Sequence, residues 1–198
     1  LTSQGTISLN STEELGMAYS FFEDHEGTIW IGTKGKGLIA AHRQHTASLK
    51  FQLHHYMADD KDLYSLSGNE IYSLYEDTNQ RLWIATFEGG VNYLDLKTAM
   101  RFPRFINHRN QLKNYPITQC YRTRFITGDE QGNIWIGSSA GLLMCNNPNS
   151  NPEQIRFRHF SRIPGDIHSL SNNDVHSIFF SKNKEMYVAT FGGGFNKL

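Results

Sequence analysis

The stretch GTIWIGTKGKGL, residues 27–38, is rich in glycine and invites comparison with phosphate-binding loops. Gly32 and Gly37 have the spacing of the two P-loop glycines, but Leu38 stands where the phosphate-binding lysine is required. A dinucleotide-binding fingerprint needs the order G-x-G-x-x-G at the start of a helix, and no amphipathic helical pattern follows this stretch. The glycines therefore do not predict a phosphate site.

The same design recurs three more times along the chain. The copies are RLWIATFEGGV (residues 81–91), NIWIGSSAGL (133–142) and EMYVATFGGGF (185–195). Their central aromatic residues are spaced 53, 52 and 52 residues apart, at Trp30, Trp83, Trp135 and Tyr187. A period of this length that contains several short strands indicates a repeat architecture of the propeller type.

Each repeat contains the pattern of four short antiparallel strands, which together form one propeller blade. An alternating segment (YSFFED, YSLYED or HSIFFS) and a polar turn lead into the central strand, as in a hairpin. Asp24, Asp77 and Asp129 at these turns are expected to accept backbone N–H bonds in Asx-turns. A third strand (LIAAH, VNYLDL or LLMCN) and a fourth (FQLHHY, RFPRFI or IRFRHF) follow. The sequence predicts an all-β fold, a single β-propeller segment over 1–198 with blades at 17–56, 67–106, 119–160 and 171–198.

One glycine of the turn after the central strand recurs in every repeat, at Gly37, Gly90, Gly141 and Gly194. A tight connection between strands needs a residue that tolerates positive φ, which predicts a structural role for this glycine. GSSAG at 137–141 matches the nucleophile elbow G-x-S-x-G, but an elbow lies between a strand and a helix. Ser139 lies instead in a turn between two strands. We therefore assign no catalytic residue and do not expect this segment to be an enzyme.

The segment SLSGNEIYSLYEDTNQRLWIATFEGGVNYLD (65–95) closely resembles the two-component regulator propeller repeat. That repeat has a Ser-Leu-Ser-x-Asn lead, an aliphatic strand, an acidic turn, a Leu-Trp-Ile-Gly-Thr strand and a Gly-Gly-Leu turn. A second copy at 169–198 keeps the lead but has Tyr187 in place of Trp and lacks the acidic turn. The copies around Trp30 and Trp135 keep the central strand and lack the lead, so the resemblance covers the chain from about Tyr19 to its end.

This resemblance implies a location and a function. Such repeats build periplasmic sensor regions of hybrid two-component systems, especially in gut Bacteroidetes, where related sensors respond to oligosaccharides. In those proteins a β-sandwich, a membrane span and a histidine kinase follow the propeller. No membrane contact is expected for this segment, because it has no long apolar run and no recognisable signal peptide at Leu1.

The length of the chain predicts a partial propeller. Four repeats account for its 198 residues, whereas seven such blades would need roughly 360. The last repeat ends after its third strand, so its fourth strand must come from elsewhere. Residues Thr6 to Leu9 could supply it and close a four-bladed ring. Alternatively, further blades or a second copy of the chain cover the open edges, since exposed edges template pairing.

Composition limits the partners. Nineteen basic residues balance nineteen acidic ones, so no long-range field would collect nucleic acid. The pairs His42/His45 and His54/His55 lack a carboxylate or second pair at zinc spacing, so no metal and no cofactor is expected. Cys120 and Cys145 either form a disulfide or remain two buried thiols.

A ligand site in a propeller lies on loops near the axis, so aligned positions that differ between repeats are candidates. We call the four central aromatic residues the anchors. The candidate ligand-binding residues eleven positions before an anchor are Tyr19, Tyr72, Arg124 and His176. Those that lie four positions after an anchor are Lys34, Phe87 and Phe191. Aromatic faces beside hydrogen-bonding groups suit an oligosaccharide. The sequence leaves two function classes open. One is a ligand-sensing segment of a hybrid histidine kinase, and the other is a structural or protein-interaction propeller with no small-molecule ligand.

Overall fold

The computed structural model describes residues 16–44, 50–99, 101–145 and 151–198. These residues form four antiparallel sheets, in which consecutive strands are neighbours. The first sheet contains β1 (Ala18–Glu23), β2 (Ile29–Thr33), β3 (Leu38–Gln44) and β4 (Lys50–Tyr56). The second contains β5 (Ile71–Glu76), β6 (Arg81–Thr86), β7 (Gly90–Asp95) and β8 (Phe105–Ile106). The third contains β9 (Thr123–Gly128), β10 (Ile134–Ser138), β11 (Gly141–Cys145) and β12 (Phe157–Phe160). The last contains β13 (Val175–Phe180), β14 (Met186–Thr190) and β15 (Gly194–Lys197). The predicted all-β propeller architecture is confirmed.

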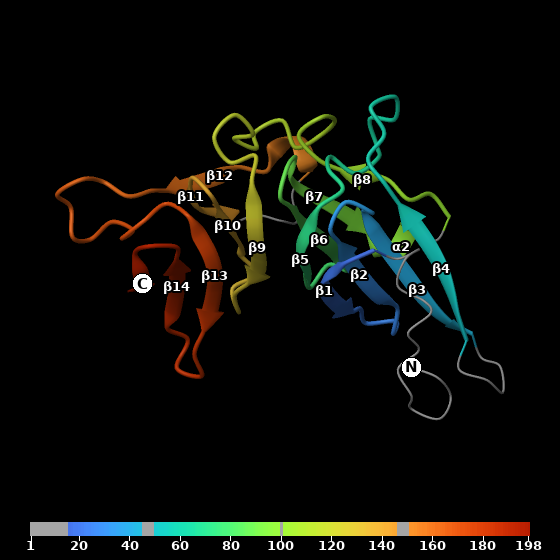
Figure 1. Ribbon diagram of the computed structural model, residues 1–198, viewed down its shortest axis with the longest axis horizontal. Coiled ribbons are helices and arrows are strands. Elements are labelled where there is room, and N and C mark those ends of the chain that lie inside the picture. The colour runs from blue at the N-terminus through green and yellow to red at the C-terminus, as the bar shows by residue number, and fades with distance from the viewer. Residues whose placement is uncertain (1–15, 45–49, 100, 146–150) are drawn as a thin grey trace.

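The sheets follow one another in chain order. β5 contacts both β1 and β9, and β9 also contacts β13, so the first strand of each sheet lies beside the first strand of the next. Figure 1 shows these four strands in sequence across the middle of the molecule, from blue β1 to red β13. The outer strands of each sheet extend away from this row. Blade-like sheets therefore bring the starts of their inner strands to one end of the molecule.

The four central aromatic residues occupy equivalent places. Trp30 and Trp83 are 2% and 0% exposed, and each fills the core between its own sheet and the following one. Trp135 packs in the same way against the last sheet. Tyr187 stands at the corresponding place on the last sheet, where its ring is only partly covered, by Phe179 and Phe195. The prediction of one repeated slot is confirmed.

The aspartate before each tryptophan does more than form a turn. In Asp24, Asp77 and Asp129, Oδ1 accepts the backbone N–H groups of the Asx-turn, as predicted. The other oxygen, Oδ2, accepts the indole N–H of the tryptophan six residues later, at 2.8 Å in each repeat. This second bond was not predicted. It fixes the ring in the core because a buried indole N–H needs an acceptor.

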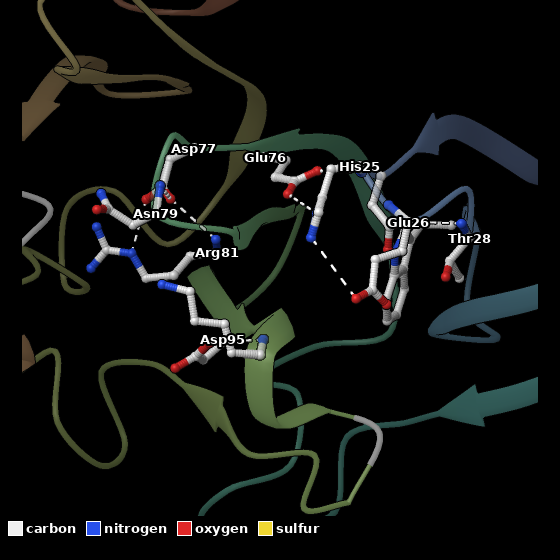
Figure 2. Close-up of polar contacts among 11 residues, drawn as sticks. His25, Glu26, Thr28, Glu76, Asp77, Asn79, Arg81 and Asp95 are labelled. Carbon is white, nitrogen blue, oxygen red and sulfur yellow. Dashed lines mark hydrogen bonds and ion pairs between the residues drawn. The ribbon is translucent and has the colours of Figure 1, made fainter.

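The turns that follow β1 and β5 are also joined to each other. The His25 backbone N–H donates to Glu76 Oε2 at 3.0 Å, and its ring Nδ1 lies at 2.5 Å from Glu76 Oε1. Figure 2 shows His25 between Glu76 and Glu26, beside the neighbouring pair of Asp77 and Arg81. The contact links the first hairpin of the first sheet to that of the second.

The hydrogen bonds of the Asp129 side chain make a pH-dependent contribution to stability. Burial alone would raise its pKa, but hydrogen bonds from Trp135, Asn133 and Gln131 hold the pKa of this carboxyl below its ordinary value. A depressed pKa stabilises the fold above the unfolded-state value of about 3.9, and this contribution is lost as the pH falls through the folded-state value. We expect Asp129→Asn to be less stable than the wild type at pH 7, with the difference narrowing below about pH 4. Urea unfolding from pH 7 to pH 3 measures it, and a difference that stays constant would contradict this origin.

Some local expectations need correction or completion. The segment RFPRFI forms only the short strand Phe105–Ile106, because Pro103 has no N–H for a strand ladder. Helix α2 (Leu96–Ala99) and the 3₁₀ turn η1 (Pro152–Gln154) were not predicted. The recurring turn glycines all have positive φ, between 69° and 133°, as predicted. Both cysteines are buried thiols and form no disulfide, which decides between the two alternatives for them. The proposed closing strand at Thr6–Leu9 lies outside the described residues.

Candidate functional site

The first strand of every sheet contains a β-bulge near its start. The pairing register skips one residue in each strand, and the skipped residues are Tyr19, Tyr72, Arg124 and His176. A bulge adds a residue without a partner and turns its side chain away from the regular strand direction. Four of the seven candidate residues therefore share one backbone device, which sequence alignment placed but did not explain.

The other candidates lie beside these bulges. The backbone N–H of the residue four after each anchor donates to the carbonyl two residues before the bulge, at 2.8–3.0 Å. The donor–acceptor pairs are Lys34–Met17, Phe87–Glu70, Ser139–Arg122 and Phe191–Asp174. Each glycine turn is thus tied to the entrance of its own first strand. Both predicted sets of residues consequently lie in one row.

Aromatic rings form the first half of this row. The rings of Tyr19 and Tyr72 meet edge to face with their centroids 4.8 Å apart, and Tyr72 stacks on Phe87 at 5.0 Å. The guanidinium of Arg124 lies over the other end of this group, 4.9 Å from the Phe87 ring centre. At the end of the row opposite to Arg124, a hydrogen bond with Tyr19 and the charge of Glu70 raise the pKa of Lys34. These contacts connect the first, second and third sheets.

Charged groups continue the row onto the last sheet. Arg124 Nε donates to Asp174 Oδ1 at 2.9 Å, and its Nη2 lies 3.4 Å from Asp174 Oδ2. Asp174 also lies 3.5 Å from His176 Nε2, and the His176 ring stacks on Phe191 at 5.5 Å. We call the continuous row the inner-strand stripe, and it consists of Lys34, Tyr19, Tyr72, Phe87, Arg124, Asp174, His176 and Phe191. The structure brings all seven predicted residues together.

Asp174 and Arg122 also lie at this surface and were not among the predicted residues. Asp174 joins Arg124 to His176, as described above. Arg122 lies 5.3 Å from the Phe87 ring centre and 5.0 Å from that of Tyr121. Both residues stand two positions before a bulge residue, in an aligned column that also varies between repeats, so the same test could have found them.

The stripe is an open surface. Phe191 is 68% exposed, and Tyr19 is 37% exposed. Two cavities, of about 620 and about 480 Å³, lie instead beside the last sheet, away from the stripe. Within the described ranges, no group of three or more His, Cys, Asp or Glu side chains could hold a metal ion. No described helix is long and apolar enough to cross a bilayer.

Comparison with known proteins finds a family match in two segments of the chain and a shared fold. The model of the two component regulator propeller family matches residues 15–35 and 65–88. No curated protein matches the chain. Two solved structures of the extracellular domain of BT4673 from B. thetaiotaomicron, named a hybrid two component system in one and a one component system in the other, are 27% and 26% identical. Their TM-scores are 0.70 and 0.68, and the match covers 92% of this chain and 24% of theirs.

More distant structures share the fold alone. PorZ, a component of the type-IX secretion system of Porphyromonas gingivalis, is 14% identical with a TM-score of 0.64, covering 90% of this chain and 25% of PorZ. Virginiamycin B lyase from Staphylococcus aureus is 13% identical with a TM-score of 0.59, covering 96% of this chain and 58% of the lyase. The chain spans about a quarter of the length of the BT4673 extracellular domain. Two segments of the chain match the two component regulator propeller model, and the chain is similar to the extracellular domain of BT4673.

Proposed function

We propose that this chain is a ligand-sensing segment of the periplasmic part of a hybrid histidine kinase, and that its inner-strand stripe recognises an oligosaccharide. The observation that carries the proposal is the continuity of the stripe, which crosses all four described sheets. Bulge residues from separate repeats would need no such continuous contact if they served only to shape the starts of their own strands.

The chemistry of the stripe suits a sugar chain. The rings of Tyr19, Tyr72 and Phe191 offer apolar faces for the C–H surfaces of pyranose rings, while Arg124 and Asp174 offer hydrogen-bonding groups for hydroxyls. An open surface also suits a chain of several sugar units better than a single one. The ligand would bind without being transformed, and binding would pass through the propeller to an attached kinase. The virginiamycin B lyase supports only the fold and no catalytic function here.

Replacing one aromatic residue of the stripe tests this proposal. Tyr72→Ala is expected to weaken oligosaccharide binding up to about tenfold, since one aromatic contact contributes about 0.5–1.5 kcal/mol beyond its buried area. Titration calorimetry against a panel of neutral and acidic oligosaccharides measures the affinity. The matched control is Phe179→Ala, which removes an exposed ring outside the stripe and leaves binding unchanged.

The alternative is a structural or protein-interaction propeller, and two open sheet faces favour it. Phe21 and Phe195 are 69% and 72% exposed on the first and last sheets. The aligned residues inside the molecule, Leu74 and Val91, are 9% and 0% exposed. Remaining blades or a second copy of the chain would cover these faces. If no oligosaccharide in the panel binds and light scattering shows concentration-dependent assembly, this alternative replaces the sensor proposal.

A further inference from the structure

The loop before the second sheet forms a small frame of hydrogen bonds. Ser65 Oγ donates to the carbonyls of Asp59 and Asp62 at 2.9 and 2.8 Å. The backbone N–H of Ser67 donates to Asn92 Oδ1 at 3.0 Å, and Asn92 Nδ2 donates back to Ser67 Oγ at 2.8 Å. The two serines of the Ser-Leu-Ser lead thereby fix the loop against strand β7.

The loop before the last sheet repeats this frame. Ser169 Oγ donates to the carbonyls of Asp166 and Ile163, at 2.8 and 3.2 Å. Ser171 N–H donates to Asn196 Oδ1 at 2.8 Å, and Asn196 Nδ2 lies 3.1 Å from Ser171 Oγ. Asn196 on β15 thus has the position and the bonds of Asn92 on β7. Both loops carry the Ser-Leu-Ser sequence, at 65–67 and 169–171, and it places the hydrogen-bond acceptors of the two frames in the same arrangement.

In the second sheet, the segment that follows β8 occupies this frame. Asn107 Nδ2 donates to the Ser65 carbonyl and to Asn92 Oδ1, both at 3.0 Å. Two residues later, the Arg109 guanidinium donates to the carbonyls of Asp59, Asp62 and Leu66, at 2.8, 3.1 and 3.3 Å. A short strand followed by Asn-x-Arg therefore closes the second sheet and binds its entry loop. Asn107 is fully buried there.

In the described part of the chain, a cavity lies beside the corresponding frame of the last sheet. Its volume is about 620 Å³, and its lining includes Asp166, Ser169, Leu170 and Asn196. β15 is the edge strand of the three-stranded sheet, so its outer N–H and C=O groups face this side. Backbone groups for a ladder, the Asn196 side-chain acceptor and the carbonyl acceptors of the loop therefore lie next to one another.

We propose that this edge and cavity form a receptor for one kind of occupant, an extended segment with an apolar strand followed by Asn-x-Arg. The segment adds antiparallel to β15 as a fourth strand. Its Asn donates to Asn196 Oδ1 and the Ser169 carbonyl, and its Arg donates to the loop carbonyls of Ile163, Asp166 and Leu170. The proposal does not depend on oligosaccharide binding at the stripe.

The chain itself supplies the probe. Because Leu198 corresponds to Leu94, appending the sequence of residues 95–111 after Leu198 continues the last sheet in the register of the second. The control extension carries Ala at the positions of Asn107 and Arg109. We expect the first extension to unfold at least about 4 °C above the control, a shift within the range for small stability gains in chains of this size. Hydrogen exchange should show slower exchange of β15 amides with the first extension than with the control.

A receptor-side variant separates this effect from a general gain in stability. Asn196→Ala removes the acceptor that the incoming Asn needs, so in this background the difference between the two extensions should shrink by more than half. Equal unfolding temperatures and equal β15 exchange for the two extensions on the unchanged chain would overturn the proposal. So would a difference that Asn196→Ala leaves intact.

Discussion

Trp83→Ala is expected to reduce the free energy of unfolding by about 3–5 kcal/mol, the usual cost of emptying a large aromatic site in a core. Trp83 is fully buried between the second and third sheets, and its ring packs 5.0 Å from that of Tyr93. Its removal also leaves Asp77 Oδ2 without the indole donor. Since a typical domain is stable by only about 5–15 kcal/mol, the loss would leave the chain close to unfolding.

The repeat provides a matched control at Tyr187. This residue holds the aligned position on the last sheet, but its outer side lacks a covering sheet among the described residues. Tyr187→Ala should therefore cost much less than Trp83→Ala. Chemical denaturation followed by circular dichroism compares the two variants. Equal losses would show that the four anchors do not pack as the structure places them.

The periodic features of the chain could be predicted from its sequence, because repetition reports on equivalent environments. The spacing of Trp30, Trp83, Trp135 and Tyr187 located every sheet, and the recurring glycine located every turn after the central strand. Misalignment by one residue would have moved each apolar residue to the wrong face of its strand, so the pattern determined the register. The shortness of β8 and the presence of helix α2 were not predicted, because they depend on local proline chemistry and packing.

The candidate site was predictable in position but not in connectivity. Variation between aligned positions selected seven residues, and all seven lie in the inner-strand stripe. The link through Asp174 depends on distances between separate sheets, which no single-sequence pattern contains. The frame around Asn196 was missed for the same reason. Its partner Ser171 lies 25 residues away, and only the comparison with Asn92 in three dimensions identifies what the frame can hold.

Asp77→Ala is expected to destabilise the chain by about 3–5 kcal/mol, as breaking a buried ion pair does. Asp77 accepts the Arg81 Nε–H at 2.9 Å and the Trp83 indole N–H at 2.8 Å. Both charged residues are less than 10% exposed, and Figure 2 shows the Arg81 side chain directed toward Asp77. Arg81 Nη2 is buried with no hydrogen-bond partner among the described residues, so loss of Asp77 removes the main compensation for a buried charge.

The first repeat offers the matched control for this charge. Asp24 makes the same bond to Trp30, but Thr28 stands at the position of Arg81. Asp24→Ala therefore loses hydrogen bonds but leaves no buried cation without its partner. It should reduce the free energy of unfolding by about 1–3 kcal/mol. In the second repeat, Arg81→Met should recover much of the loss caused by Asp77→Ala, because an apolar side chain needs no counter-charge. Urea denaturation of the two single variants at Asp24 and Asp77 and of the double variant measures these terms. If Arg81→Met gives no recovery, the loss belongs to the Asx-turn and the indole bond, and the buried cation makes no separate contribution.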